Sequence, residues 1–529
     1  MAHSPLPDVE IPDLSIFDYL FGDLSEHELD VVALVDGTTG AQTTFRQLVG
    51  QISLLAGALA KRGIGVGDTV GLLCPNIPAF ATVFHGVLRA GATATTINSL
   101  YTATEIANQL TDAGATWLFT VSPLLPQAGA AASSIGIDDA HVVVLDGADG
   151  HPSLRDLLSE GNPAPEVSFD PAEHLAVLPY SSGTTGHPKG VMLTHRNLVA
   201  NVAQSSGSIG LGEGDRVLAV LPFFHIYGMT VLLNFAVKRR AALITMPKFD
   251  LPEFLRIISE QRCTWVFIAP PIAVALAKHP LVDQYDLSSI EVIFSGAAPL
   301  DGSLARSVAE RLSCTVCQGY GMTELSPVSH SIPVDRPELD RSSVGLPLPN
   351  TEARIVDIES GEEIETPDEG VSASGELLVR GPQVMKGYLG NDDATGRTLD
   401  ADGWLHTGDI ASVGAGGEYY IVDRLKELIK YKGYQVAPAV LEAVLLGHPG
   451  IADAAVVGAQ DADRQEIPKA FVVRQQGAQL DEAAVMEYVA QHVAPHEKVR
   501  AVEFIDVIPK SSAGKILRKD LRARAHAMS

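Results

Sequence analysis

Short apolar runs alternate with amphipathic stretches from about residue 44 to residue 297. The runs are rich in Val, Ile and Ala and cover residues 69–74, 115–121, 141–146, 216–222, 241–246, 264–270 and 291–297. In the stretches 44–63 and 251–261, apolar residues recur at helical spacing. Continuous apolar runs are typical of parallel strands buried on both faces, and amphipathic helices connect such strands. The pattern therefore predicts an α/β fold here.

The pattern changes near Arg354. Shorter, alternating strands are predicted at 353–360, 375–381 and 417–423, joined by Gly, Asp and Glu turns that are typical of an antiparallel module. Mixed helical and strand patterns follow from about residue 440 and predict a compact α+β unit of about a hundred residues. We therefore expect an α/β protein with a large N-terminal body of layered α/β subdomains and a small β module (residues 1–422), followed by a small α+β C-terminal domain (residues 423–529).

Composition and charge support this division. The chain has 529 residues, of which 46% are hydrophobic, so it is too long for a single core. Its net charge is −26, which makes nucleic acid or an anionic membrane an unfavourable partner. Residues 423–529 hold 15 Lys+Arg and 14 Asp+Glu, whereas the preceding residues hold 23 and 50. The two parts therefore differ in their electrostatics.

Targeting and redox features point to a cytoplasmic protein. Four cysteines are too few for a disulfide scaffold, and Cys314 and Cys317, read as a strand, would lie on opposite faces and not share a metal. The N-terminus has no basic segment followed by an apolar run, and the C-terminus does not read SKL. Residues 217–237 are uncharged, but Pro222, His225 and Gly228 make a buried core more plausible than a membrane span.

The strongest motif is YSSGTTGHPKGVMLT at residues 180–194. Small hydroxyl residues and glycines let backbone N–H groups and hydroxyls approach phosphate oxygens closely, and Lys189 adds a positive charge. The motif is not a Walker A loop, because Gly190 follows the lysine where that loop needs Ser or Thr. A helix is predicted to begin around residues 194–197. This segment is the candidate phosphate-binding loop.

Together with further strings, this motif resembles the adenylate-forming acyl-CoA synthetases, and within them most closely the 4-coumarate-type CoA ligases. The strings are LPFFHIYGM (221–229), SGAAPL (295–300), QGYGMTE (318–324), GWLHTGD (403–409), DRLKELIKYKGYQVAP (423–438) and PKSSAGK (509–515). Taken alone, each residue has an ordinary explanation as a turn, core or surface residue. Their occurrence together and in order favours the functional interpretation.

The resemblance implies two half-reactions: a carboxylate attacks the α-phosphate of ATP to give acyl-AMP and pyrophosphate, and the thiol of coenzyme A then displaces AMP. ATP, Mg²⁺ and coenzyme A would be the cofactors or substrates, and no prosthetic group is expected. Because two anions meet in the first step, the site must supply positive charge. Glu324 matches the magnesium ligand, Thr323 would hold the phosphate, Lys515 would reach the reacting oxygens, and His225 would act as a gate beside the carboxylate.

The resemblance also implies the remaining site residues. Expected in the ATP site are Ser181, Ser182, Gly183, Thr184, Thr185, Lys189, Ala297, Gln318, Gly319, Tyr320, Gly321, Thr323, Asp409, Arg424 and Lys515. Expected in the acyl pocket are Tyr227, Gly296, Gly321, Pro327 and Val328, with Ala297 beside them. Lys430, Lys432 and Gly433 would bind coenzyme A after the C-terminal domain rotates about a hinge at Lys426.

The small pocket residues favour cinnamate or 4-coumarate as the acid. Several alternatives stay open at this stage. The acid could be a medium- or long-chain fatty acid, or the acceptor could be a carrier protein. A non-catalytic nucleotide-binding protein and a luciferase-like oxygenase are more remote, and the oligomeric state and pathway are left open.

Overall fold

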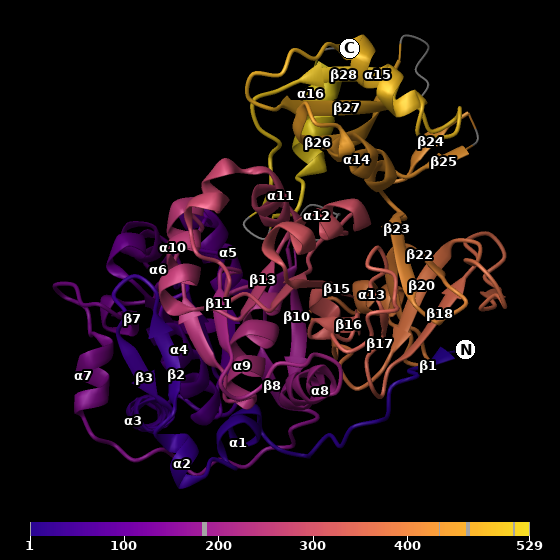
Figure 1. Cartoon of the computed structure of the whole chain (residues 1–529). Helices are drawn as coiled ribbons and strands as arrows, with labels where there is room; N and C mark the ends of the chain where they lie inside the picture. The colour runs from indigo at the N-terminus through magenta and orange to yellow at the C-terminus, as the bar shows by residue number, and fades with distance from the viewer. Residues whose placement is uncertain (1, 182–187, 433, 462–465, 512–513, 528–529) are drawn as a thin grey trace.

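A computed structural model of the chain describes residues 2–181, 188–432, 434–461, 466–511 and 514–527. Two large sheets form the N-terminal body, a smaller antiparallel sheet lies beside them, and a separate C-terminal unit lies above (Figure 1). The helices are α1 (Ile16–Phe21), α2 (Glu26–Leu29), α3 (Phe45–Lys61), α4 (Pro78–Arg89), α5 (Ala103–Asp112), α6 (Leu125–Ser134), α7 (Leu154–Ser159), α8 (His195–Ser206), α9 (Phe235–Lys238), α10 (Leu251–Gln261), α11 (Pro270–Lys278), α12 (Gly302–Leu312), α13 (Asp392–Thr398), α14 (Pro438–Gly447), α15 (Glu482–Ala490) and α16 (Arg518–Ala527). The expected α/β class is confirmed.

The first large sheet has nine strands. In spatial order they are β17 (Leu346–Pro347), β16 (Val328–Ser331), β15 (Thr315–Gly321), β14 (Val292–Ser295), β13 (Trp265–Ile268), β11 (Arg216–Ala219), β12 (Ala242–Thr245), β2 (Val32–Asp36) and β3 (Gln42–Thr44). The strands from β15 to β2 are parallel. Four of the predicted apolar runs form its central strands, and these strands are buried because helices cover both faces.

The second large sheet has eight strands. Their order is β21 (Gly387–Tyr388), β10 (Lys189–Thr194), β8 (Leu175–Val177), β5 (Thr93–Thr96), β4 (Thr69–Leu72), β6 (Ala115–Thr120) and β7 (Val142–Val144), with β9 (Tyr180–Ser181) paired to β10. It is parallel from β8 to β7 and antiparallel around β10. The helix expected after the phosphate-loop motif is α8, and a reciprocal capping box between Thr194 and Asn197 defines its start.

The third sheet is the predicted antiparallel module. It consists of β1 (Ala2–His3), β18 (Glu352–Val356), β20 (Gly375–Arg380), β22 (Leu405–Val413) and β23 (Tyr419–Arg424), with β19 (Glu363–Ile364) at the edge of β18. Its last strand leads directly toward the C-terminal unit (Figure 1).

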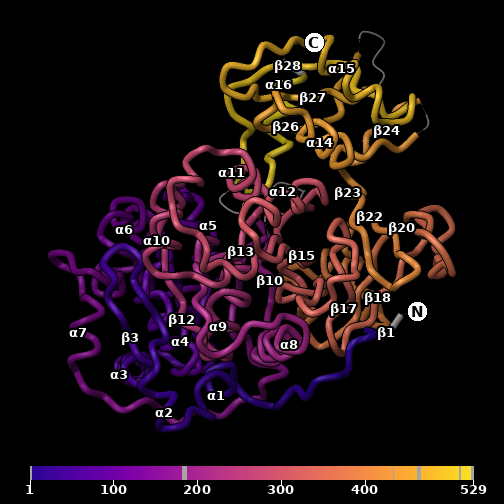
Figure 2. Tube along the Cα trace, viewed as in Figure 1, coloured from indigo at the N-terminus to yellow at the C-terminus, as the bar shows by residue number. Residues whose placement is uncertain are grey.

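The C-terminal unit lies at one end of the molecule (Figure 2). It holds a sheet of β26 (Ile451–Gln460), β27 (Glu466–Arg474) and β28 (Ala501–Phe504), and a hairpin of β24 (Ile429–Tyr431) and β25 (Tyr434–Val436). The large N-terminal core reaches Ile421 along the chain, and the core of this unit begins at Ile429. The domain boundary expected at residue 423 falls within this interval and stays a prediction.

The uncharged segment 217–237 is part of the N-terminal core. It forms β11, a π-helix η3 (Tyr227–Asn234) and α9, and most of its side chains are buried. Within the described residues, no helix has both the length and the apolar character needed to cross a membrane. The cytoplasmic location expected from the sequence stays a prediction.

Candidate active site

A cavity of about 1000 Å³ opens where strands of both large sheets end. Gly296 and Ala297 directly follow β14, and Pro179 follows β8. Tyr227 begins η3, the next helix after β11. Ligand sites in α/β proteins form at the carboxyl ends of parallel strands, because the connecting loops meet there. Residues of β22, of β23 and of the segment before α16 line the cavity as well. The two large sheets, the antiparallel module and the C-terminal unit therefore all contribute to it.

Most of the residues that the motifs singled out line this cavity. They are Ser181, Lys189, His225, Tyr227, Gly296, Ala297, Gly319, Tyr320, Gly321, Thr323, Glu324, Pro327, Val328, Asp409, Arg424, Lys426 and Lys515. Ser182, Gly183, Thr184, Thr185 and Gly433 lie outside the described residues. The individual roles expected for all of these residues stay predictions.

Three of the singled-out residues do not line the cavity. The Gln318 side chain is buried and exchanges hydrogen bonds with the backbone of Leu300, so it supports the loop that follows β14. Lys430 lies in β24, and Lys432 follows it with a positive φ of 50° at the hairpin turn. In Figure 1 the hairpin lies at the right-hand edge of the C-terminal unit, at about the height of α14.

Glu324 is a buried carboxylate at the cavity wall. It lies in a short 3-10 turn, Thr323–Leu325, and is only 6% exposed. Its Oε1 accepts a hydrogen bond from the Tyr388 hydroxyl at 2.8 Å and from Ser181 Oγ at 3.3 Å. Among the described residues, no side chain donates to its other oxygen, Oε2. One oxygen is therefore held by the protein, and the other can serve a ligand.

Asp409 forms a second anchored carboxylate. Its Oδ2 accepts a hydrogen bond from the Tyr320 hydroxyl at 2.6 Å, and its Oδ1 lies 3.2 Å from Arg424 Nε. Asp409 and Arg424 are register partners in β22 and β23, which explains why residues 15 positions apart meet. Burial, with the Asp409 charge as a second cause, raises the pKa of Tyr320 well above its usual value, so this phenol stays a donor.

Lys515 reaches this cavity from the C-terminal domain. Its backbone N–H donates to Ser511 Oγ at 3.2 Å, and Gly514 beside it has a φ of 80°, which favours glycine. Burial, with the positive charge of Arg424 as a second cause, lowers the pKa of the Lys515 ammonium to about 8. The lysine is thus a partly desolvated cation in a cavity that already contains two anchored carboxylates.

His225 and Tyr227 line another part of the cavity wall. The backbone N–H of Tyr227 donates to His225 Nδ1 at 3.3 Å, which leaves the proton of the neutral ring on Nε2. Burial, and to a lesser degree Lys515, lowers the pKa of His225 to about 4, so the ring is neutral at pH 7. The buried Tyr227 hydroxyl has no hydrogen-bond partner among the described residues.

Two glycines are required by the packing of this wall. A Cβ at Gly296 would lie 2.7 Å from the Tyr227 ring, and a Cβ at Gly321 would lie 2.1 Å from the backbone oxygen of Pro327. A larger residue at either position would have to displace its neighbour. Gly296 therefore lets the Tyr227 ring pack against the backbone, and Gly321 lets β15 approach the backbone of Pro327 closely.

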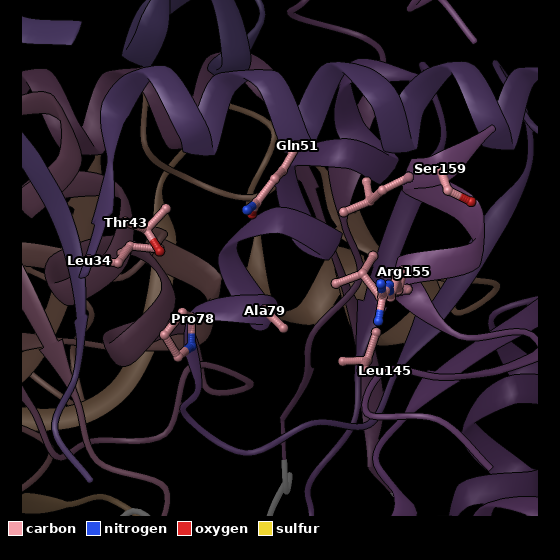
Figure 3. A pocket seen from close by; sticks show the side chains of 10 residues that line it. Leu34, Thr43, Gln51, Pro78, Ala79, Leu145, Arg155 and Ser159 are labelled. Atoms are coloured by element: carbon pink, nitrogen blue, oxygen red, sulfur yellow. The ribbon is translucent and has the colours of Figure 1, made fainter. Parts of the chain in front are cut away.

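A second cavity, of about 550 Å³, lies in the N-terminal body between α3, α4 and α7 (Figure 3). Leu34, Pro78 and Leu145 are among its lining residues. Of the described residues that line it, only Arg155 is charged, and that side chain is exposed. This cavity offers no convergent set of reactive groups, in contrast to the first.

Sequence reasoning missed Tyr388, which lines the main cavity and contacts Glu324. The residue follows Gly387 in a two-residue strand, and nothing in a Gly-Tyr pair indicates chemistry. Arg397, in α13, lines the cavity as well and was not singled out. The position of both residues depends on how β21 and α13 pack, which sequence patterns do not reveal.

Comparison with known proteins agrees with this geometry. Residues 23–389 match the family of AMP-binding enzymes, and residues 440–515 match the AMP-binding enzyme C-terminal domain. The chain is 42% identical to 4-coumarate–CoA ligase 5 of Oryza sativa subsp. japonica over 99% of its length and 97% of that protein. It is 41% identical to 4-coumarate–CoA ligase 4 of Arabidopsis thaliana, over 99% of this chain and 94% of that one.

A solved structure resembles the whole molecule. The anthranilate CoA ligase AuaEII, in complex with anthranoyl-AMP, superposes with a TM-score of 0.89 and 27% identity, and the match covers all of both chains. The family matches and the full-length similarity agree with each other. The chain belongs to the AMP-binding enzyme family.

Proposed function

We propose that this protein is an ATP-dependent carboxylate–CoA ligase that acts through an acyl-AMP intermediate. The main support is that Lys515, from the C-terminal domain, lines the same cavity as Glu324, Asp409 and His225. The relatives that match over nearly the full length are named 4-coumarate–CoA ligases, and such ligases catalyse the same class of reaction. A protein that only senses nucleotides would not need this second domain at the site.

In the first half-reaction, a carboxylate oxygen of the acid attacks the α-phosphorus of ATP and pyrophosphate leaves. Lys515 supplies positive charge to the oxygens that become more negative in the transition state. Lys189 and Thr323 hold the phosphates, and Asp409 and Tyr320 bind the nucleoside. His225, neutral at pH 7, donates from Nε2 to the carboxylate without adding a charge to the pocket.

Glu324 is the residue we propose to hold Mg²⁺ together with the phosphates of ATP. Among the described residues, no cluster of three or more His, Cys, Asp or Glu side chains could hold a metal alone. A single buried carboxylate with a free oxygen fits Mg²⁺, which commonly uses one or two carboxylates and completes its shell with phosphates and water. When bound, the ion would neutralise part of the phosphate charge.

The acid is an aryl-propenoate such as cinnamate or 4-coumarate. Tyr227, Pro327 and Val328 line the cavity beside Gly296 and Gly321, which have no side chains, and such a lining suits a flat ring in a narrow slot. A long alkyl chain would need an open end to the slot. Medium-chain acids are expected to react as well, although more slowly. Discrimination is incomplete because one methylene in an apolar pocket changes specificity by only about 1 to 3 kcal/mol.

In the second half-reaction, the thiol of coenzyme A attacks the acyl carbonyl and AMP leaves. Lys430 and Lys432 lie outside the cavity here, so their proposed contact with coenzyme A requires the C-terminal domain to rotate about Lys426. The same rotation would remove Lys515 from the site. One cavity would thereby serve two different second substrates in turn.

The test is pyrophosphate release with a panel of aryl and alkyl acids, each with and without coenzyme A. We expect cinnamate and 4-coumarate to exceed a saturated acid of sixteen carbons in kcat/KM, and thioester to form only with coenzyme A. A higher kcat/KM for the long-chain acid would contradict the choice of acid but not the ligase activity. Absence of acyl-AMP with every acid would contradict the ligase activity itself.

A further inference from the structure

The backbone of Tyr388 is fixed by several hydrogen bonds at the edge of the cavity. Its strand β21 pairs with β10, with Val191 and Tyr388 in register. Its N–H donates to Thr395 Oγ1 at 2.9 Å, and the N–H of Leu389 donates to the backbone oxygen of Gly190 at 2.9 Å. Only 6% of the residue is exposed. The side chain is therefore held in one orientation by the sheet and by its surroundings.

Two charged residues contact this side chain at different points. The hydroxyl donates to Glu324 Oε1 at 2.8 Å, and the Lys189 ammonium lies over the ring, 4.7 Å from its centroid. Glu324 lies in the 3-10 turn Thr323–Leu325 and Lys189 in β10. Among the described residues, no direct ion pair joins them. Tyr388 thus contacts both the Glu324 carboxylate and the Lys189 ammonium.

These contacts keep the two charges apart. A lysine on a flexible four-carbon stem readily pairs with a nearby buried carboxylate. The ring attracts the ammonium through its negative face, and the hydroxyl satisfies one carboxylate oxygen with a charge-assisted hydrogen bond. Glu324 Oε2 and the Lys189 ammonium are then both available to a ligand that carries a cation and phosphates.

We propose that Tyr388 is a positioning residue that holds Glu324 through its hydroxyl and Lys189 through its ring, so that the two bind a cation and a phosphate group side by side. This inference rests on the proposed function, because it takes ATP with Mg²⁺ as the ligand. It assigns to Tyr388 a role in which the tyrosine does not react but sets the positions of Glu324 and Lys189, which bind the ligand. The hydroxyl and the ring have separable roles.

Two variants separate these roles. Tyr388→Phe removes the hydroxyl but keeps the ring beneath Lys189, whereas Tyr388→Leu removes both. Tyr420→Phe is the matched control, since the Tyr420 hydroxyl also donates to a carboxylate, Glu418, at 3.0 Å, and Tyr420 does not line the cavity. Thermal unfolding of each variant establishes that it is folded before any binding measurement.

The first measurement is the affinity for ATP by calorimetry, with and without Mg²⁺. For Tyr388→Phe we expect unchanged affinity for ATP alone, while the gain in affinity on adding Mg²⁺ falls about tenfold, in line with the loss of a hydrogen bond to a charged group. Tyr388→Leu should in addition bind ATP alone more weakly. The control should match the wild-type protein in both titrations.

The second measurement is the kcat and KM of acyl-AMP formation, where Tyr388→Phe should mainly lower kcat. A Tyr388→Phe protein with the wild-type gain from Mg²⁺ would overturn the inference, as would equal losses with and without the metal. A wild-type protein that binds ATP but forms no acyl-AMP would instead contradict the proposed function. The titrations would still decide the role of Tyr388.

Discussion

Lys515 is the residue whose removal should separate the two half-reactions. It lines the cavity as a partly desolvated cation, and loss of a preorganised charge at a developing negative charge costs about 10² to 10³ in rate. We therefore expect Lys515→Ala to lose acyl-AMP formation by this factor and to keep thioester formation from supplied acyl-AMP. Lys519→Ala, an exposed lysine in α16, is the control. Equal damage to both steps would contradict the role of Lys515.

The same lysine predicts the pH dependence of acyl-AMP formation. Burial lowers the pKa of Lys515 to about 8, so the side chain is cationic below that pH and loses its charge above it. Because kcat/KM reports ionisations of the free enzyme, it should stay level toward neutral pH and fall as the pH rises through about 8. A profile that rises over this range would show that the neutral amine is the active form.

Tyr227 predicts a preference among aryl acids. Tyr227 lines the pocket, and its buried hydroxyl has no partner among the described residues. An unpaired buried hydroxyl gains free energy when a ligand pairs with it. We expect 4-coumarate to exceed cinnamate in kcat/KM by about three- to tenfold, the range of one neutral hydrogen bond. Tyr227→Phe should remove this preference while still accepting cinnamate. An unchanged ratio in the variant would exclude Tyr227 as the partner of the ring hydroxyl.

The residues of the cavity could be predicted largely because they occur in strings of unusual composition. Glycines and hydroxyl residues near one lysine indicate phosphate, whatever the fold. Tyr388 could not be found in this way, because its importance lies in what it touches. Gln318 is the opposite case: it lies within a motif, but it supports the loop beside the cavity and does not line the cavity itself.

At the scale of elements, a buried ion pair joins α14, β26 and α16. Arg518 donates to both oxygens of Glu442 at 2.7 Å, and Glu442 Oε1 also accepts the backbone N–H of Val456 at 2.8 Å. The two side chains are 14% and 10% exposed. This pair anchors α16, and with it the segment that carries Lys515, to the C-terminal domain.

Arg518→Met should therefore destabilise the C-terminal domain. The substitution leaves the Glu442 carboxylate buried without its partner, which typically costs about 3 to 5 kcal/mol. Arg524→Met in the same helix should cost less than about 1 kcal/mol, because Arg524 is exposed and Lys469 still pairs with Glu503. Thermal and denaturant unfolding measure both values. Equal effects of the two substitutions would contradict the anchoring role.

Strand type was easier to predict than strand order. Parallel strands such as β11 and β13 are buried on both faces, so their sequences are continuous apolar runs. The order of the strands depends on contacts between distant segments, and two-residue strands such as β21 have no periodicity to detect. The π-helix η3 was not foreseen either, because a buried apolar run shows no helical period.

At the scale of the whole molecule, a few contacts join the C-terminal domain to the body. Lys278 Nζ, at the end of α11, donates to the backbone oxygen of Leu446 at 3.0 Å. A Cβ at Gly514 would lie 3.1 Å from Ala269, so the loop beside Lys515 packs closely against the start of α11. This arrangement brings Lys515 to the cavity and leaves the β24–β25 hairpin outside it.

Lys426→Pro should fix the C-terminal domain in one arrangement. Proline restricts φ to about −65°, so a hinge that must change its dihedral angles cannot do so. We expect acyl-AMP formation to persist and transfer to coenzyme A to be lost in single-turnover assays of each step. Lys426→Ala is the control, because it removes the side chain but leaves the backbone free. Transfer at the wild-type rate in the proline variant would exclude a hinge at this residue.

The most direct test of the central claim follows the oxygen atoms of the acid. If the carboxylate attacks the α-phosphorus of ATP and the thiol then attacks the carbonyl, 4-coumarate labelled with ¹⁸O in its carboxylate must transfer one labelled oxygen to AMP. Mass spectrometry of the products should therefore find one ¹⁸O in AMP, one in the thioester and none in pyrophosphate. Unlabelled AMP, or label in inorganic phosphate together with ADP, would contradict an acyl-AMP intermediate.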